Sequence, residues 1–130
     1  MEVLSQLQSY GVGFQVKVLA SLMNHRQFLQ NIYDILDEEY FDNPAHKWIV
    51  KNILSYHHKY NATPTYDALA VEFQKLDNDV LKVAIREQLR DIKHTSAEDR
   101  DYVEQEFANF CRNQQLKSAI LSLPALLNNG

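Results

Sequence analysis

The sequence has few residues that break regular structure, with only 3 glycines and 3 prolines among 130 residues. A fold of many short strands needs turn-forming residues at many connections. Their scarcity argues against such a fold and favours long helices joined by few connections. Hydrophobic residues make up 45% of the chain, which is enough apolar material for the core of one domain of ordinary size.

Cysteine and long apolar runs are scarce as well. The single cysteine, Cys111, has no second thiol in the chain with which to form a disulfide, and this suits a reducing cytoplasm. Residues 1–10 lack the basic start and the apolar run of a signal peptide. No stretch of about 18 apolar residues is present, so we expect no membrane-spanning helix and a cytoplasmic location.

A surplus of basic residues is also missing. The chain has 13 Lys and Arg against 17 Asp and Glu, a net charge of -4. Nucleic-acid-binding domains draw much of their affinity from neutralising phosphates and usually carry a basic surplus. We therefore expect weak or no direct DNA binding. Lys47, Lys51 and Lys59 form a small basic edge beside Tyr56, which we interpret as solvated surface.

Motifs for catalysis, metal binding and nucleotide binding are missing too. The chain contains no HExxH, CxxC, GxxxxGK[ST] or GxGxxG motif and no Asp-rich calcium loop. The neighbours of Cys111 at helical spacing are Phe107, Ala108 and Gln115, none of which can activate a thiol. We interpret the five histidines as surface or capping residues. The prediction is that this chain has no catalytic, cofactor-binding or metal-ligating residue and no cofactor. A small enzyme or metal-binding helical domain is the least favoured alternative.

The sequence does contain apolar residues at helical spacing. This spacing predicts helices over roughly residues 12–24, 28–36, 44–60, 65–76 and 78–92. Asn43 is expected to cap the third of these and Pro44 to lie in its first turn, while Thr63 or Thr65 caps the fourth. Ser96 and Asp99 resemble a capping arrangement before the last helix. The predicted fold is all-α: a frayed segment at residues 1–10, a compact helical head of about five helices, and a long C-terminal helix or helical hairpin.

The predicted last helix has two apolar groups that point in different directions. The first group is Val103, Phe107 and Phe110, and the second is Leu116, Ile120, Leu123 and Leu127. Phe110 and Leu116 are six residues apart, which is about 600° of helix rotation and turns the second group by about 120° from the first. One helix of this kind can contact its own domain with one part and another element with the other. Pro124 is expected to end or kink the helix.

Two segments resemble a known family. Residues 39–49 read Glu-Tyr-Phe-Asp-Asn-Pro-Ala-His-Lys-Trp-Ile, and residues 63–69 read Thr-Pro-Thr-Tyr-Asp-Ala-Leu. They resemble blocks in the N-terminal domain of DnaB-type replicative DNA helicases, and the similarity extends over roughly residues 11–127. The matching motif residues are Pro44, Ala45, His46 and Pro64. Asn61-Ala62 stands where the family usually has a glycine, which fits a divergent phage or plasmid member.

The resemblance implies a role in DNA replication. In that family this domain precedes a RecA-like ATPase motor, forms a collar on the hexamer and docks the primase, and it holds none of the ATPase residues. Residues 11–127 would then be a non-catalytic collar domain, and residues 128–130 the start of a linker to a motor domain. The parent chain would be an ATP-dependent 5'-3' DNA helicase, with ATP and Mg bound only in the motor. The implied partners are a second copy (as a dimer, a trimer of dimers or a hexamer collar), primase and a helicase loader.

The residues expected to mediate assembly come mainly from the second apolar group of the last helix. We assign self-association to Phe110, Leu116, Ile120 and Leu123, because pairing would remove apolar surface from water. Tyr102 and Phe107 are assigned to partner binding, with primase as the partner. The alternative function is a stand-alone helical adaptor, such as a helicase loader or regulator.

Overall fold

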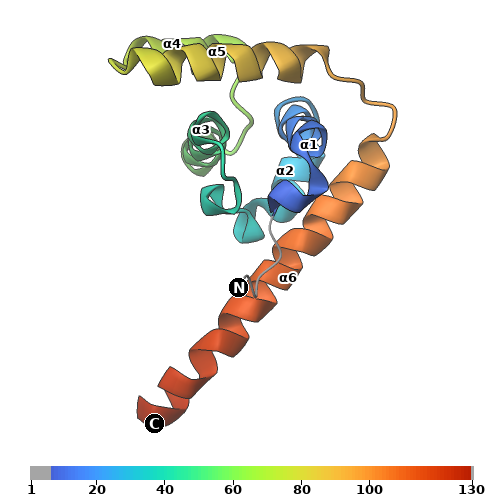
Figure 1. The fold of residues 1–130 in the computed structure, drawn as a ribbon, viewed down its shortest axis with the longest axis vertical. Coiled ribbons are helices and arrows are strands. Elements are labelled where there is room, and N and C mark those ends of the chain that lie inside the picture. The colour runs from blue at the N-terminus through green and yellow to red at the C-terminus, as the bar shows by residue number, and fades with distance from the viewer. Residues whose placement is uncertain (1–6, 130) are drawn as a thin grey trace.

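Residues 7–129 fold into helices joined by short loops. The computed structural model describes these residues, and side chains are described for residues 7–123. The elements are η1 (Leu7–Tyr10), α1 (Val12–Asn24), α2 (Arg26–Ile32), η2 (Tyr33–Ile35), η3 (Glu38–Tyr40), α3 (Pro44–Tyr60), α4 (Tyr66–Gln74), α5 (Asp79–His94) and α6 (Arg100–Asn129). Helices α1–α5 and the first part of α6 form the head, and the rest of α6 extends past it (Figure 1). The predicted all-α fold class is confirmed, and the long C-terminal element is a single helix.

Short polar side chains determine where three helices begin. The Asn43 side chain accepts a hydrogen bond from the Ala45 backbone N–H at 2.8 Å, and Pro44 occupies the first turn of α3. The Thr65 hydroxyl accepts from the backbone of α4 at 3.1 Å, so Thr65 rather than Thr63 caps that helix. The Asn78 side chain caps α5 in the same way at 3.0 Å. Each cap satisfies a backbone N–H group that has no partner inside its helix.

The N-terminal segment and the second helix differ from the prediction. Residues 7–10 are not frayed, since they form η1 and Leu7 is only 1% exposed. The remainder of the predicted frayed segment, residues 1–6, lies outside the described residues. The helix predicted over residues 28–36 is shorter: α2 ends at Ile32, and η2 follows as a separate 3₁₀ turn.

The start and the end of α6 also differ from the prediction. The Ser96 hydroxyl accepts from the Glu98 backbone N–H at 3.1 Å in the loop before the helix, so Ser96 does not cap α6. Asp99 forms an ion pair with Lys17 of α1 at 2.9 Å. The helix continues to Asn129, so Pro124 does not end it. Of the predicted linker, residues 128–129 belong to α6 and Gly130 lies outside the described residues.

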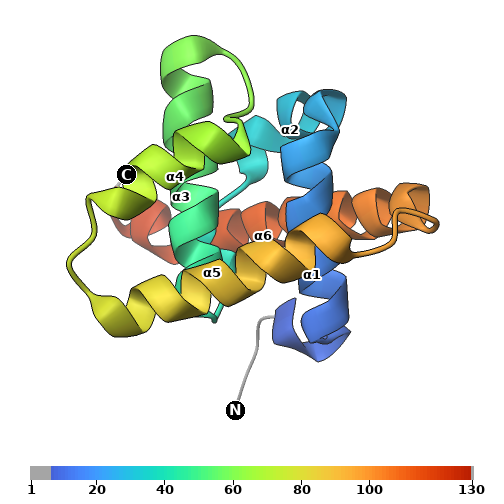
Figure 2. The same cartoon turned by 90° about the horizontal axis from the view of Figure 1, so that it is seen from above.

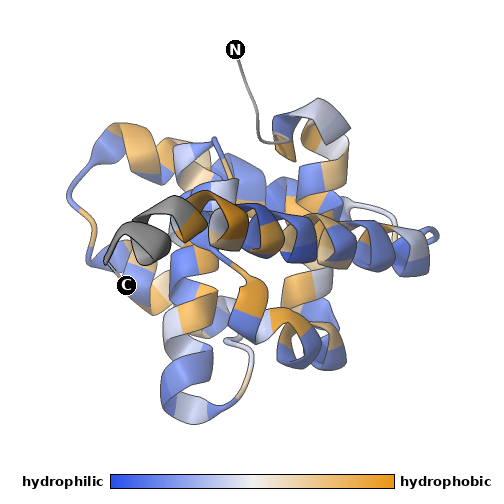
Figure 3. Cartoon of the chain, turned by 90° about the horizontal axis from the view of Figure 1, so that it is seen from below, coloured by the Kyte–Doolittle hydropathy of each residue, from blue (hydrophilic) through white to orange (hydrophobic). Residues whose placement is uncertain are grey.

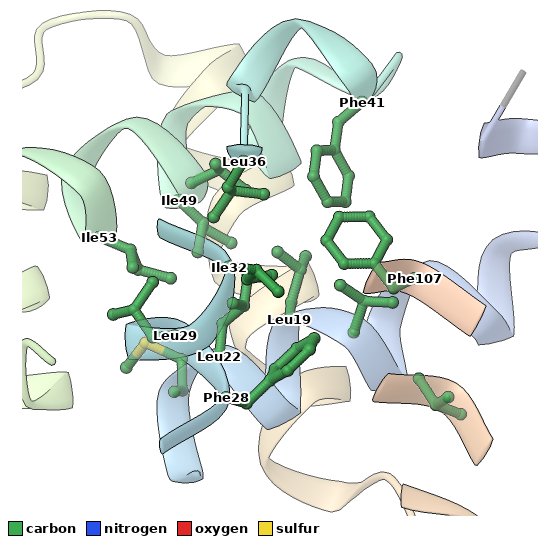
Figure 4. Packing of buried hydrophobic residues seen from close by; sticks show 14 of the residues in the cluster. Leu19, Leu22, Phe28, Leu29, Ile32, Leu36, Phe41, Ile49, Ile53 and Phe107 are labelled. Atoms are coloured by element: carbon green, nitrogen blue, oxygen red, sulfur yellow. The ribbon is translucent and has the colours of Figure 1, made fainter. Parts of the chain in front are cut away.

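Helix α1 lies at the centre of the head. Leu19 and Leu22 of α1 are fully buried, and they meet apolar side chains of α2, α3 and α6 (Figure 4). Helix α5 crosses over α1 and α3 on the opposite side of the head from α6 (Figures 1 and 2). The central position of α1 explains its run of buried residues, which covers more of its surface than one stripe.

Aromatic packing fixes the first half of α6 to the head. The Phe107 ring is fully buried, with its centroid 5.9 Å from that of Phe41 and 6.3 Å from that of Phe28. Figure 4 shows the rings of Phe41 and Phe107 side by side. A short contact between His25 Nδ1 and Glu104 Oε2, 2.7 Å, adds a polar link from the end of α1. The first half of α6 is therefore part of the core of the head.

Candidate interaction surface

The second half of α6 carries apolar side chains that the head does not cover. Leu116, Ile120 and Leu123 are 59%, 53% and 49% exposed, and we call these three residues the α6 stripe. Successive positions of the stripe are separated by four and three residues, which places them on one face of the helix. Figure 3 shows hydrophobic bands on α6 near its C-terminal end, and Figure 1 shows this part of the helix leaving the head. Leu127 was predicted to continue the stripe, but its side chain lies outside the described residues.

Phe110 does not belong to this surface, and its assignment to self-association is corrected. Its side chain is only 4% exposed. The ring of Tyr40 packs edge-on against it at 5.5 Å, and the ring of Tyr10 does so at 6.0 Å. These two tyrosines come from η3 and η1, so the contacts that bury Phe110 are distant in the sequence.

The two residues assigned to partner binding lie in different environments. Tyr102 is 64% exposed in the first turn of α6 and is accessible to another molecule. Phe107 is completely buried, so its assignment to partner binding is corrected. Phe107 faces the head because it lies one turn beyond Val103, which is also buried.

The four motif residues lie around the two ends of α3. Pro44 and Ala45 form its first turn, with Ala45 buried, and Pro64 is buried between α3 and α4. His46 is 1% exposed and its Nε2 atom lies 2.6 Å from Oε1 of Gln88 on α5. Burial lowers the pKa of His46, and the hydrogen bond to Gln88 partly opposes this effect. His46 therefore joins α3 to α5, and its burial corrects the interpretation of this histidine as a surface or capping residue.

The environment of Cys111 suppresses the reactivity of its thiol. Burial raises the pKa of the Cys111 thiol to about 12, and the side chain is fully covered, so it is not a reactive nucleophile. Among the residues with described side chains, no group of three or more His, Cys, Asp or Glu could hold a metal ion. In the same part of the chain, no helix is long and apolar enough to span a bilayer.

A second surface feature lies between α4 and α5, and the sequence analysis missed it. Lys82, Arg86, Arg90 and Lys93 follow one another at intervals of four, four and three residues along α5. We call these four residues the α5 basic row. The spacing of these four residues is visible in the sequence, although the net charge of the whole chain is acidic. The aromatic side chains of α4 that pack beside the row could not be assigned to it before the fold was known.

Comparison of the chain with protein-family models, with curated proteins and with solved structures found no match.

Proposed function

We propose that this chain is the non-catalytic collar domain of a DnaB-type replicative DNA helicase, that it assembles through the α6 stripe, and that it docks replisome proteins such as primase. The proposal combines the family resemblance of residues 11–127 with one observation. That observation is the α6 stripe, whose three large apolar side chains are each about half exposed. The cytoplasm is the proposed location.

The position of the stripe supports self-association. Phe107 anchors the first half of α6 in the core, so the second half is held out from the head on a continuous helix. Contiguous exposed apolar surface on a folded domain commonly marks an interaction site. Two stripes packed against each other would remove apolar area from water at about 25 cal/mol per Å², opposed by the entropy lost on association. Because every copy carries the same surface, a self-complementary contact is the simplest arrangement that covers it.

We propose a division of labour in the parent protein, in which this domain makes contacts and another domain carries out catalysis. ATP and Mg would bind in a motor domain encoded after this segment, and the collar would supply contacts to the ring and to its partners. This part of the proposal is tested by the reading frame after codon 130. A Walker A motif encoded there supports the proposal, whereas a stop codon would leave the stand-alone adaptor as the function.

Self-association is tested by introducing charge into the stripe. The double variant Leu116→Asp/Ile120→Asp should be monomeric at concentrations where the unchanged chain forms dimers or larger assemblies, as measured by multi-angle light scattering and sedimentation equilibrium. The matched control is Val80→Asp/Val83→Asp, which places the same two charges at exposed apolar positions of α5, 81% and 50% exposed. The control should associate as the unchanged chain does. A monomeric unchanged chain at millimolar concentration, or equal association of all three proteins, would show that the stripe is not a self-association surface.

A further inference from the structure

The surface between α4 and α5 is a groove lined by apolar and cationic side chains. Its volume is about 520 Å³. Tyr66 and Phe73 of α4 and Leu89 of α5 supply its apolar lining, and Arg86, Arg90 and Lys93 supply the charge. The lining of the groove therefore combines apolar side chains from both helices with positive charge from α5.

The charge in the groove is unbalanced. No Asp or Glu is among the lining residues, although acidic residues outnumber basic ones in the chain as a whole. Among the described side chains, Arg86, Arg90 and Lys93 form no ion pair with a carboxylate. Cations without acidic partners on one face create a local positive potential, and this potential favours a ligand that carries negative charge.

The aromatic rings of the groove hold these cations in place. Lys93 Nζ lies 4.7 Å from the centroid of the Tyr66 ring, and Arg86 Cζ lies 5.4 Å from that of Phe73. Lys82 Nζ lies over the Phe73 ring at the same distance, 5.4 Å. Each ring thus has a cation over a face. Single-stranded nucleic acids use open aromatic faces for base stacking, so cations stacked on these rings disfavour that mode of binding. A protein segment needs no stacking platform, because its carboxylates can bind the cations and its apolar side chains can enter the groove.

We propose that the α4–α5 groove docks an acidic amphipathic helix of a partner protein. Arg86 and Arg90 are four residues apart, a rise of about 6 Å along α5. Carboxylates at positions i and i+4 of a partner helix have the same separation and can therefore meet both arginines. A leucine or phenylalanine on the adjacent face of that helix would lie over Leu89 and between the rings of α4. This proposal uses none of the α6 stripe residues and does not depend on the proposed self-association.

The binding preference is tested with three fluorescent probes measured by fluorescence anisotropy. The first is a helical peptide of about 12 residues, the length that matches the α5 basic row, with Glu at i and i+4 positions and Leu on the adjacent face. The second has Gln in place of every Glu, and the third is an oligothymidine of similar length. We expect the Glu peptide to bind at least about tenfold more tightly than the Gln peptide and the oligothymidine, with an affinity that falls as salt is added. A Gln peptide of equal affinity would overturn the proposal. Tighter binding of the oligothymidine would overturn it in favour of a nucleic-acid surface.

The location of the site is tested with two kinds of variant. Arg86→Glu/Arg90→Glu should weaken Glu-peptide binding at least about tenfold. Ala70→Trp leaves the charge unchanged and fills the groove from α4, and it should weaken binding by a similar factor. The matched control, Lys51→Glu/Arg112→Glu, makes the same charge change at exposed positions outside the groove and should retain most of the affinity. Circular dichroism verifies that each variant is folded. Equal weakening by the control, or full affinity in both groove variants, would show that the peptide does not bind in the groove.

Discussion

The buried side chain of His46 links the stability of the fold to pH. Its Nε2 atom is paired with Gln88, while its Nδ1 atom is buried without a hydrogen-bond partner among the described residues. Burial disfavours the charged imidazolium and lowers the pKa of His46 in the folded chain. The unfolded chain therefore binds a proton at this residue before the folded chain does, and stability falls as the pH drops below the unfolded value of about 6.5.

Replacing His46 should reduce this pH dependence. We expect the free energy of unfolding, measured by urea denaturation, to decrease from about pH 7 to about pH 5 in the unchanged chain and to decrease less in His46→Gln. His46→Gln should also be less stable at neutral pH, because the substitution disturbs a packed site. His58→Gln, at an exposed position of the same helix, is the control and should keep the original pH dependence. If the stability of His46→Gln depended on pH as that of the unchanged chain does, protonation of His46 would not be the cause of the pH dependence.

The environments of individual residues were only partly predictable. Helical spacing placed Val103 and Phe107 on one face correctly, but it could not show which face of α6 the head covers. Phe110 is buried because Tyr10 and Tyr40 pack against it, and both come from short 3₁₀ elements with no strong local pattern. Such contacts depend on the tertiary fold, so no window of the sequence around Phe110 contains them.

The helix caps were predicted unevenly: Asn43 caps α3 as expected, whereas Ser96 does not cap α6. The Asn43–Pro44 pair places the start of α3 at the correct residue, because the cap and the helical N–H groups it binds lie within a few residues of each other. The element η1 was missed, and its Leu7 is buried in the core; η2 was predicted as part of a longer helix and has no side-chain cap. The spacing of the α5 basic row can be read from the sequence of α5 alone. The groove beside the row forms only where α4 packs next to α5, so it could not be predicted from that spacing.

The cap of α3 should make a measurable contribution to stability. Asn43→Ala removes the side chain that accepts the Ala45 N–H hydrogen bond, and it should cost about 1 kcal/mol of unfolding free energy in urea denaturation. Asn113→Ala is the control, because Asn113 is exposed in the middle of α6 and caps no helix. This control should stay within about 0.5 kcal/mol of the unchanged chain or be slightly more stable. Equal stability of the two variants would contradict a structural role for the cap.

For the whole molecule, the two halves of α6 should be separable by truncation. A chain that ends at Gln115 keeps the buried face of α6 and loses the α6 stripe. At concentrations too low for association, its unfolding free energy should lie within about 1 kcal/mol of that of the full chain, because the removed side chains with described positions are mainly exposed. At higher concentration it should remain monomeric in sedimentation experiments.

A core substitution provides the contrast for this truncation. Phe107→Ala in the same shortened chain should cost about 3–5 kcal/mol, because it removes a fully buried ring from the centre of the aromatic cluster. If the truncation alone were as destabilising as Phe107→Ala, the second half of α6 would have to be part of the core of the monomer.

The all-helical class and the long last helix could be predicted from the scarcity of turn residues and from apolar spacing. These signals are properties of the chain alone. The proposed partners of the α6 stripe and of the α4–α5 groove are separate molecules, so their surfaces are not encoded in this segment. The sequence predicts Leu116, Ile120 and Leu123 as one apolar face, and the structure shows that this face is exposed on the single chain.

The continuity of α6 has a mechanical consequence. From Phe107, in the core, to Leu123 the helix rises about 24 Å without interruption. The helix can therefore act as a rigid lever, because Phe107 packs against the rings of Phe28 and Phe41 and fixes the first half of α6 to the head. If the head tilts by about 10°, the far end of such a lever swings by about 4 Å, close to the rise of three residues. For a molecule bound to the far end of α6, a small rotation of the head would therefore displace the bound surface far enough to change how the side chains at that contact pack.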